Sequence, residues 1–379
     1  MHRRTVILIA VLLAAGTAGA SYFQAGDLIF VPAVAHNEGV AGSLWRSDLT
    51  ITNVDEVPVD VAVFFLPSGV GDNSIYLDTR TFGLGGRSEE AWGHVNEALA
   101  DIPPGGTVTI EDIVGQYWAD EFGMQASLGA LVIFAYEAGT ADAEGGPVYR
   151  NVVATTRTYN QTTIWVPDPE SEDPDNPTFI QKDASYGQTI PGVPWYAMAD
   201  PNATSEQGDF SYVMLTGGAD TDVLRYNVGF VNASDKQTSV TLHVIPYDST
   251  GAQFVDADGN PVERFITLGP LGHFQINRVF RNWFELDQDI TGAVIKVEFD
   301  SWQTTSPTPT PLFTAYGSYV DGRTNDPTTV LPTFAFPFNV ECMFPSPPAD
   351  DGGDGGAAAK LEETAVREGL RRPLSLPRR

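Results

Sequence analysis

Few of the residues able to perform acid–base or nucleophilic chemistry lie close together in this sequence. None of the four histidines after residue 20 has another histidine within five positions; these are His36, His94, His243 and His273. The sequence contains no Gly-x-Ser-x-Gly turn, Walker-type phosphate loop, His-Glu-x-x-His or Cys-x-x-Cys. A Ser–His–Asp triad is assembled from distant residues, so the sequence leaves that arrangement open. We expect no enzyme.

Carboxylates are abundant, and glycoside hydrolysis requires a pair of them. The chain has 49 Asp and Glu residues. Glu137, Asp142 and Glu144 cluster in one predicted loop, and Glu298 and Asp300 lie at one predicted strand end. With so many acids, such clusters arise from composition alone. A secreted, glycosidase-like hydrolase with dispersed carboxylates is therefore our second alternative.

One short segment resembles the start of a calcium loop. Asp256, Asp258 and Asn260 alternate around Gly259, so their oxygens are spaced as calcium ligands. The third ligand and the bidentate Glu expected beyond the glycine are missing. The segment also lies between two predicted strands, where Asp-Gly is an ordinary hairpin turn. We interpret it as a turn and expect no cofactor; weak calcium binding is the alternative.

Aromatic residues offer a second kind of site, because flat rings stack on sugar rings. Trp165, Trp195 and Tyr196 lie near a predicted connector and outside the predicted core elements, which makes them the candidate ligand-binding residues. Packing of the connector explains them equally well. A carbohydrate-binding module that uses these aromatics is the first alternative to a purely structural role.

The N-terminus and the charge restrict location and partners. Residues 1–20 combine a basic start, an apolar run and small residues ending in Ala20, which predicts a secretory signal peptide. No later stretch is apolar enough to span a membrane. The net charge of −28 argues against nucleic acid as a partner. Cys342 is the only cysteine, so no internal disulfide is expected. We predict a secreted protein at the cell surface, in the periplasm or outside the cell.

Strand and turn signals run through the body of the chain. In the N-terminal part, the predicted strands are Leu28–Val34, Ser47–Asn53, Val59–Leu66, Ser74–Phe82, Thr107–Ile110, Leu128–Tyr136 and Val148–Tyr159. In the C-terminal part, they are Phe210–Thr216, Arg225–Asn232, Ser239–Tyr247, Val262–Leu268, His273–Ile276, Thr291–Phe299 and Phe313–Val320. About seven strands in each part is the number expected for a β-sandwich.

The two parts also match each other in sequence. Trp45–Asn53 aligns with Leu224–Asn232, and the turns that follow have equal length. Apolar residues spaced i, i+1, i+4 and i+5 at Ile113–Trp118 recur at Val279–Phe284, which predicts one short helix in each part. We therefore predict an all-β protein of two tandem, internally duplicated, Ig-like β-sandwich domains, each closed by one helix.

The predicted domain boundaries follow from composition. Residues 1–20 are the signal peptide, and residues 21–165 form β-sandwich domain 1. An acidic, proline-rich connector covers 166–208, and domain 2 covers 209–340. A disordered linker and basic tail cover 341–379.

Several segments carry a resemblance to a known type of protein. They are Trp45–Asn53, Phe65–Pro67, Thr156–Asn160 and Tyr186–Pro191. In these segments the chain resembles uncharacterised secreted bacterial proteins with tandem immunoglobulin-like sandwich domains. The resemblance implies an extracellular sandwich and assigns no catalytic residue. Our main prediction is a non-catalytic secreted or surface module for structure, adhesion or binding, with a polysaccharide or another surface protein as its partner.

Overall fold

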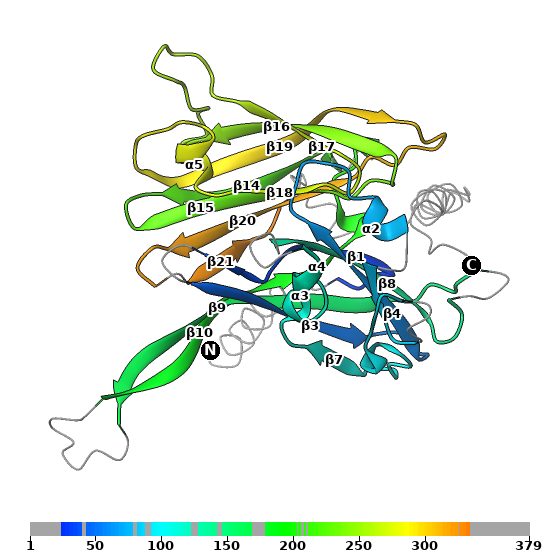
Figure 1. Ribbon diagram of the computed structural model, residues 1–379. Helices are drawn as coiled ribbons and strands as arrows, with labels where there is room; N and C mark the ends of the chain where they lie inside the picture. Colours follow the sequence, from blue (N-terminus) through cyan, green and yellow to red (C-terminus); the bar gives the residue numbers. More distant parts are fainter. Residues whose placement is uncertain are drawn as a thin grey trace, which may run out of the picture.

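The computed structural model describes residues 24–39, 43–78, 82–87, 92–122, 128–141, 146–168, 179–202, 204–205, 208–209, 211–324 and 326–333. The predicted signal peptide, Cys342 and the predicted tail lie outside these residues. Below, residues 24–202 are called the first half and residues 211–333 the second half. Both halves consist of β-strands joined by loops and short helices (Figure 1).

Two sheets make up the first half. One has the strand order β11-β1-β8-β4-β5-β6, and the other has the order β10-β9-β3-β2, with β7 also paired to β3. The strands of the six-stranded sheet are Leu28–Ala35 (β1), Val59–Pro67 (β4), Gly83–Gly85 (β5), His94–Val95 (β6), Leu128–Glu137 (β8) and Val193–Pro194 (β11). Those of the five-stranded sheet are Asn37–Glu38 (β2), Leu44–Asn53 (β3), Thr107–Ile110 (β7), Val152–Pro167 (β9) and Phe179–Pro191 (β10).

The second half also contains two sheets, each of four strands. Their orders are β14-β19-β16-β17 and β18-β15-β20-β21, and a small pair, β12-β13, precedes them. The small pair, Thr204–Ser205 (β12) and Gly208–Asp209 (β13), lies in the chain between the two halves. The strands of the second half are Tyr212–Asp220 (β14), Leu224–Asn232 (β15), Thr238–Tyr247 (β16), Arg264–Leu268 (β17), His273–Ile276 (β18), Ile290–Thr304 (β19), Phe313–Asp321 (β20) and Pro327–Val330 (β21).

Helices are short in both halves. They are Ile75–Asp78 (α2), Glu97–Leu99 (η3), Ile113–Tyr117 (α3), Ala119–Phe122 (α4), Trp195–Ala197 (η5) and Val279–Asn282 (α5). The two expected helices are present as α3 and α5. Phe280 of α5 is completely buried, and so is Trp118, which caps the C-terminal end of α3. None of the helices within the described residues has the length and hydropathy that a membrane crossing requires.

One predicted strand is wrong. The segment Ser74–Phe82 contains the single turn α2 instead. The Asp72 carboxylate accepts a hydrogen bond from the backbone N–H of Ser74 at 2.8 Å, a local turn that directs the chain into a helix. Leu77 of this turn is buried in the core.

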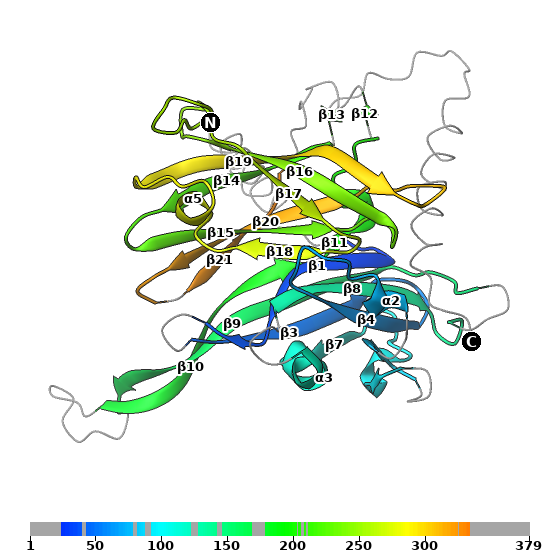
Figure 2. The same cartoon turned by 45° about the horizontal axis from the view of Figure 1, so that its top comes forward.

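The prediction of two tandem, Ig-like β-sandwiches is also wrong. The protein is all-β, but its four main sheets take a four-bladed, propeller-like arrangement and do not form two tandem Ig-like sandwiches. Figures 1 and 2 show the sheets from two directions. One buried cluster joins the halves: Leu28, Phe30 and Phe64 of the first half share it with Val231, Leu271 and Leu312 of the second. Each half also has a buried cluster that is largely its own, and this third cluster packs the two halves together.

The physical reason lies in strands that are buried on both faces. All eight residues of β1 and the first eight of β4 are buried. A sandwich strand alternates between core and solvent, whereas a strand covered on both faces is a continuous apolar run. The runs Leu28–Val31 and Val61–Leu66 are of this second kind. Their outer faces need a covering layer, which the second half supplies.

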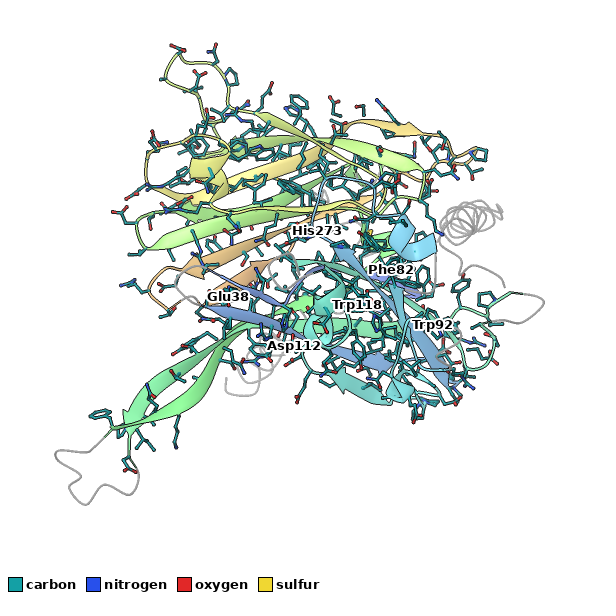
Figure 3. All side chains as sticks on the ribbon, in the orientation of Figure 1. Glu38, Phe82, Trp92, Asp112, Trp118 and His273 are labelled. Atoms are coloured by element: carbon teal, nitrogen blue, oxygen red, sulfur yellow. The ribbon has the colours of Figure 1, made fainter. Side chains whose placement is uncertain are left out.

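Backbone hydrogen bonds add to the junction between the halves. The loop after β4 meets the loop between β17 and β18: Gly69 N–H donates to the His273 carbonyl at 2.6 Å, and Gly269 N–H donates to the Val70 carbonyl at 2.8 Å. The Asn73 side chain donates to the Leu271 carbonyl at 3.1 Å. His273 therefore lies where the halves meet (Figure 3).

The predicted connector, residues 166–208, contributes strands to the first half. β10 pairs with β9 along its full length, from Phe179 opposite Pro167 to Pro191 opposite Thr155. The outer part of this hairpin extends away from the other sheets (Figure 1). β11 then pairs with β1 at the junction between the halves.

Candidate functional site, a cleft between the two halves

The structure does not bring the three predicted aromatic residues together at one exposed site. Trp195 is 5% exposed, packs in the cluster shared by the halves, and donates from Nε1 to Asp27 Oδ1 at 3.2 Å. Tyr196 is exposed, and its hydroxyl donates to the Ala25 carbonyl at 2.6 Å. Trp165 lies on β9 opposite Gln181 of β10, close to the Pro167–Phe179 end of their pairing. Packing accounts for Trp195.

The predicted calcium residues form a tight turn. Asp256 Oδ1 accepts hydrogen bonds from the backbone N–H groups of Asp258 and Asn260, both at 2.9 Å, and Gly259 has a φ of +84°. The hydrogen bonds from Asn260 lower the pKa of the Asp256 carboxyl. The described residues contain no group of three or more His, Cys, Asp or Glu side chains placed to hold a metal ion.

The predicted carboxylate clusters are engaged in ion pairs. Glu298 contacts both Lys296 and His243 Nδ1, the latter at 3.1 Å. Glu137 pairs with Arg150. Asp142 and Glu144 lie outside the described residues. Glu298 and Glu137 are therefore each held by a basic side chain, and Asp300 accepts a hydrogen bond from the Ser301 hydroxyl at 2.9 Å.

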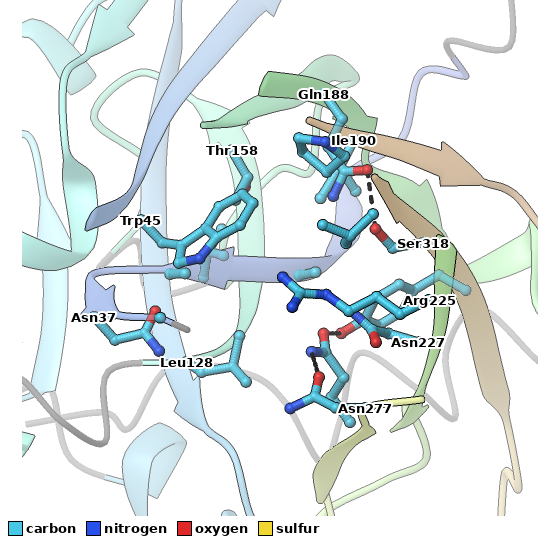
Figure 4. A pocket seen from close by; sticks show the side chains of 18 of the residues that line it. Asn37, Trp45, Leu128, Thr158, Gln188, Ile190, Arg225, Asn227, Asn277 and Ser318 are labelled. Atoms are coloured by element: carbon cyan, nitrogen blue, oxygen red, sulfur yellow. Dashed lines mark hydrogen bonds between the residues drawn. The ribbon is translucent and has the colours of Figure 1, made fainter. Parts of the chain in front are cut away.

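A different feature emerges at the junction of the halves, a cleft of about 300 Å³ (Figure 4). This volume is at the lower end of the range for small-molecule sites, about 300–1,000 Å³. The first half lines it from β3 and the β9–β10 hairpin, and the second half from β15, β18 and β20. Its polar and aromatic lining includes Asn37, Trp45, Gln188, Arg225, Asn227 and Asn277.

A chain of hydrogen bonds connects the core to one wall of the cleft. The Tyr316 hydroxyl donates to Gln275 Oε1 at 2.8 Å, and Gln275 Nε2 donates to Asn277 Oδ1 at 2.9 Å. On the core side, the Tyr316 oxygen lies 3.3 Å from His273 Nε2. Burial lowers the pKa of His273 to about 4, so its ring is neutral at pH 7. These bonds hold the amides of Gln275 and Asn277 in place.

The start of α5 is fixed by a second set of polar contacts. Asn227 Oδ1 accepts from the Arg278 backbone N–H at 3.1 Å. The Arg278 guanidinium donates to Asp220 Oδ1 at 2.7 Å and to the Thr221 carbonyl at 2.9 Å. Asp220 is fully buried, so this ion pair anchors the loop that carries Arg278 and Asn277. The second-half wall of the cleft is therefore held in one geometry.

Trp45 and Arg225 face the open space of the cleft from opposite halves (Figure 4). Both side chains are half-buried. Gly39 packs against the indole, since a Cβ at this position would lie 2.4 Å from Trp45 Nε1. Burial, and secondarily the charge of Arg278, lowers the pKa of the Arg225 guanidinium.

The lining of the cleft is suited to binding rather than proton transfer. No His, Asp or Glu is among the described residues that line it. Its three hydroxyl side chains are already paired: Thr158 Oγ1 with Ser47 Oγ at 2.8 Å, Ser318 Oγ with Gln188 Oε1 at 3.3 Å, and the Tyr316 hydroxyl with Gln275 Oε1 at 2.8 Å. Nothing in the described lining is placed to activate a nucleophile.

Sequence reasoning missed this site. It placed Trp45 in a segment that the two halves share and did not single out Arg225 or the amides. The lining residues extend from Ala33 to Pro327, and no local motif connects them. The one available signal was the group of amide residues Gln275, Asn277 and Asn282, which begins inside the predicted strand His273–Ile276 and continues beyond it.

Comparison with known proteins adds no assignment. The sequence matches no protein-family model and no curated protein. The resemblance to secreted bacterial proteins therefore stays a prediction, and the function must be argued from the cleft.

Proposed function

We propose that this protein is a non-catalytic binding module that takes a short saccharide in the cleft between its halves. The observation that carries the proposal is the pairing of one half-buried indole, Trp45, with a wall of fixed amide side chains. In this proposal the protein acts outside the cell, because residues 1–20 have the pattern of a secretory signal peptide.

The chemistry of sugars supports this choice of ligand. A sugar ring carries hydroxyl groups that both donate and accept hydrogen bonds, and its C–H faces pack against flat aromatic rings. Amide side chains of Asn and Gln offer one acceptor oxygen and two donor hydrogens each. Asn37, Asn227 and Asn277 bring such groups into the same cleft as the Trp45 indole.

Pre-organisation of the wall favours binding of a small polar ligand. Asn277 is held by Gln275, and Asn282 Nδ2 donates to the Asn277 carbonyl at 2.8 Å. A ligand therefore meets groups whose side-chain entropy has already been lost on folding, which lowers the cost of association. The absence of His, Asp and Glu from the described lining supports binding over hydrolysis.

The test is saccharide binding by the full chain without its predicted signal peptide. Trisaccharides of glucose, xylose, galactose, N-acetylglucosamine and galacturonic acid are titrated while tryptophan fluorescence and calorimetric heat are followed. At least one should bind, and Trp45→Ala should weaken binding about tenfold or more, equivalent to about 1.4 kcal/mol.

The matched control is Trp302→Ala. Trp302 is 40% exposed on β19 and does not line the cleft, so this variant should bind as tightly as the unmodified protein. Thermal melting of each variant establishes that it is folded. Failure of every trisaccharide to bind, or equal weakening by the two substitutions, would refute the proposal.

A further inference from the structure

The cleft has an apolar strip on the side of the first half. The strip consists of aliphatic side chains from β1, β8 and β10: Ala33, Val34, Ala35, Leu128 and Ile190. Leu128 is the register partner of Ala35 in the antiparallel pair of β1 and β8, so these two side chains lie next to each other on one face of the sheet. Leu128 is half-buried, whereas the other four residues are buried. Within the strip, Leu128 therefore offers the most surface to a ligand.

Such a strip is a poor surface for a sugar that carries only hydroxyl groups. A hydroxyl group placed against Leu128 would give up its hydrogen bonds to water and find no partner in the strip. A methyl group in the same place would instead remove apolar surface from water on both sides of the contact. The strip therefore favours a sugar that carries a small apolar substituent beside its ring.

Amide side chains accompany the strip. In the view of Figure 4, Leu128 lies between Asn37 of the first half and Asn277 of the second half, and all three line the cleft. Asn277 Oδ1 accepts a hydrogen bond from Gln275 Nε2. No described residue accepts a hydrogen bond from the Asn277 Nδ2 group, so this group can donate to an oxygen of the ligand. A substituent that packs on Leu128 therefore finds hydrogen-bonding groups in the same cleft.

The charges of the lining give no reason to expect an ionic substituent. Arg278 is paired with the fully buried Asp220 at 2.7 Å, and Arg225 also has an interaction of its own within the protein. The described lining contains no carboxylate that would attract a cationic group. The net charge of −28 repels anionic polysaccharides. The substituent should therefore be neutral as well as partly apolar.

We infer that the saccharide taken by this cleft carries an acetamido group, whose methyl packs on Leu128 and Ala35 while its amide pairs with the side-chain amides of the wall. This inference rests on the proposed function and adds the substituent on the sugar ring. An acetamido group joins one methyl group to one N–H donor and one C=O acceptor, and it carries no charge. It therefore matches both the strip and the amides, whereas a hydroxyl group matches only the amides.

The experiment compares sugars that differ only in the group at carbon 2 of each ring. One series consists of cellotriose, the N-formylated trisaccharide of glucosamine and its N-acetylated counterpart, all β-1,4-linked. A second series has the galactose configuration and the same three groups. Calorimetry measures each affinity. In at least one series the acetamido member should bind about tenfold or more tightly than the hydroxyl member, with the formamido member between them because it has the amide but not the methyl.

Two variants assign the methyl contact to Leu128. Leu128→Asn replaces the apolar side chain by a polar one of similar size, so the advantage of the acetamido over the formamido member should disappear while binding of the hydroxyl member stays. Leu128→Met is the matched control, because it keeps an apolar side chain and should keep the advantage. Thermal melting establishes that each variant is folded. If Leu128→Asn does not fold, the comparison of formamido and acetamido members in the unmodified protein still tests the methyl contact.

The outcomes separate the two proposals. Equal binding of the hydroxyl and acetamido members, or of the formamido and acetamido members, would overturn the inference about the acetamido group and leave the saccharide proposal standing. Tighter binding of the galacturonic acid trisaccharide than of either acetamido member would do the same. An acetamido advantage that survives Leu128→Asn in a folded protein would also overturn the inference. No binding of any saccharide would overturn both proposals.

Discussion

His273 makes the stability of this protein depend on pH in a direction that the structure determines. The side chain is fully buried at the junction of the halves, and burial lowers its pKa from 6.5 to about 4. In the unfolded chain the ring takes up a proton near its ordinary pKa. Between pH 6.5 and pH 4 the unfolded state therefore binds more protons than the folded state. Stability must fall as the pH falls through this window.

The magnitude follows from the two pKa values. Acidification from pH 7 to pH 5 should cost about 2 kcal/mol of unfolding free energy through this one group, and the loss should level off at about 3 kcal/mol below pH 4. In the folded protein the ring takes up a proton only near pH 4, so saccharide binding by the folded protein should stay unchanged from pH 7 to pH 5. It should weaken only near pH 4, where protonation of His273 disturbs its contact with Tyr316.

Urea denaturation at several pH values between 5 and 7.5 measures the effect. The comparison is between the unmodified protein and His273→Gln, which has no titrating ring. The variant should be less stable at pH 7 but should lose about 2 kcal/mol less on acidification to pH 5. Tyr316→Phe removes the hydroxyl beside the ring, keeps the histidine buried, and should retain the pH dependence. Equal losses in the unmodified protein and His273→Gln would refute the reasoning.

Two further predictions concern the packing and ion pairs of the scaffold. Trp118 is fully buried, stacks on Phe65 with ring centroids 5.7 Å apart, and donates a hydrogen bond from Nε1 to the Phe82 carbonyl. Trp118→Ala should therefore lower the free energy of unfolding, measured in urea, by about 3–5 kcal/mol. A loss of less than about 1 kcal/mol would contradict this packing. Asp220→Asn leaves the Arg278 guanidinium without its charged partner. Since that guanidinium is about one-third exposed, we expect a loss of about 1–3 kcal/mol in thermal or urea unfolding, with an unchanged stability as the contrary result.

Strand positions were predictable where the pattern is local. The predicted strands Thr107–Ile110 and His273–Ile276 coincide with β7 and β18. The Asp256–Asn260 turn was likewise readable, because its hydrogen bonds connect residues four positions apart or fewer. The wrong strand prediction at Ser74–Phe82 also has a local cause. The Asp72 side chain accepts a hydrogen bond from the backbone two residues later, and this turn competes with strand formation.

The assembly of the sheets was beyond such reasoning. The continuous apolar runs in β1 and β4 indicated burial on both faces, and the Ig-like prediction did not use them. Even with that signal, the residues of a strand do not indicate which other segment of the chain will pack against it. Val231 and Leu271 do so here from about 200 residues away.

The sequence by itself determined the all-β class, most strands, the two short aromatic helices and the strongly acidic character, since each depends on composition or on neighbours within one turn or strand. Only the tertiary structure decided that a third buried cluster packs the halves together, that Trp195 lies inside this cluster, and that Trp45 and Arg225 line one cleft. The physical reason is that burial energy depends on the area two surfaces cover together, whatever their separation in the chain. Residues as distant as Asn37 and Ser318 therefore become neighbours only once both halves are packed.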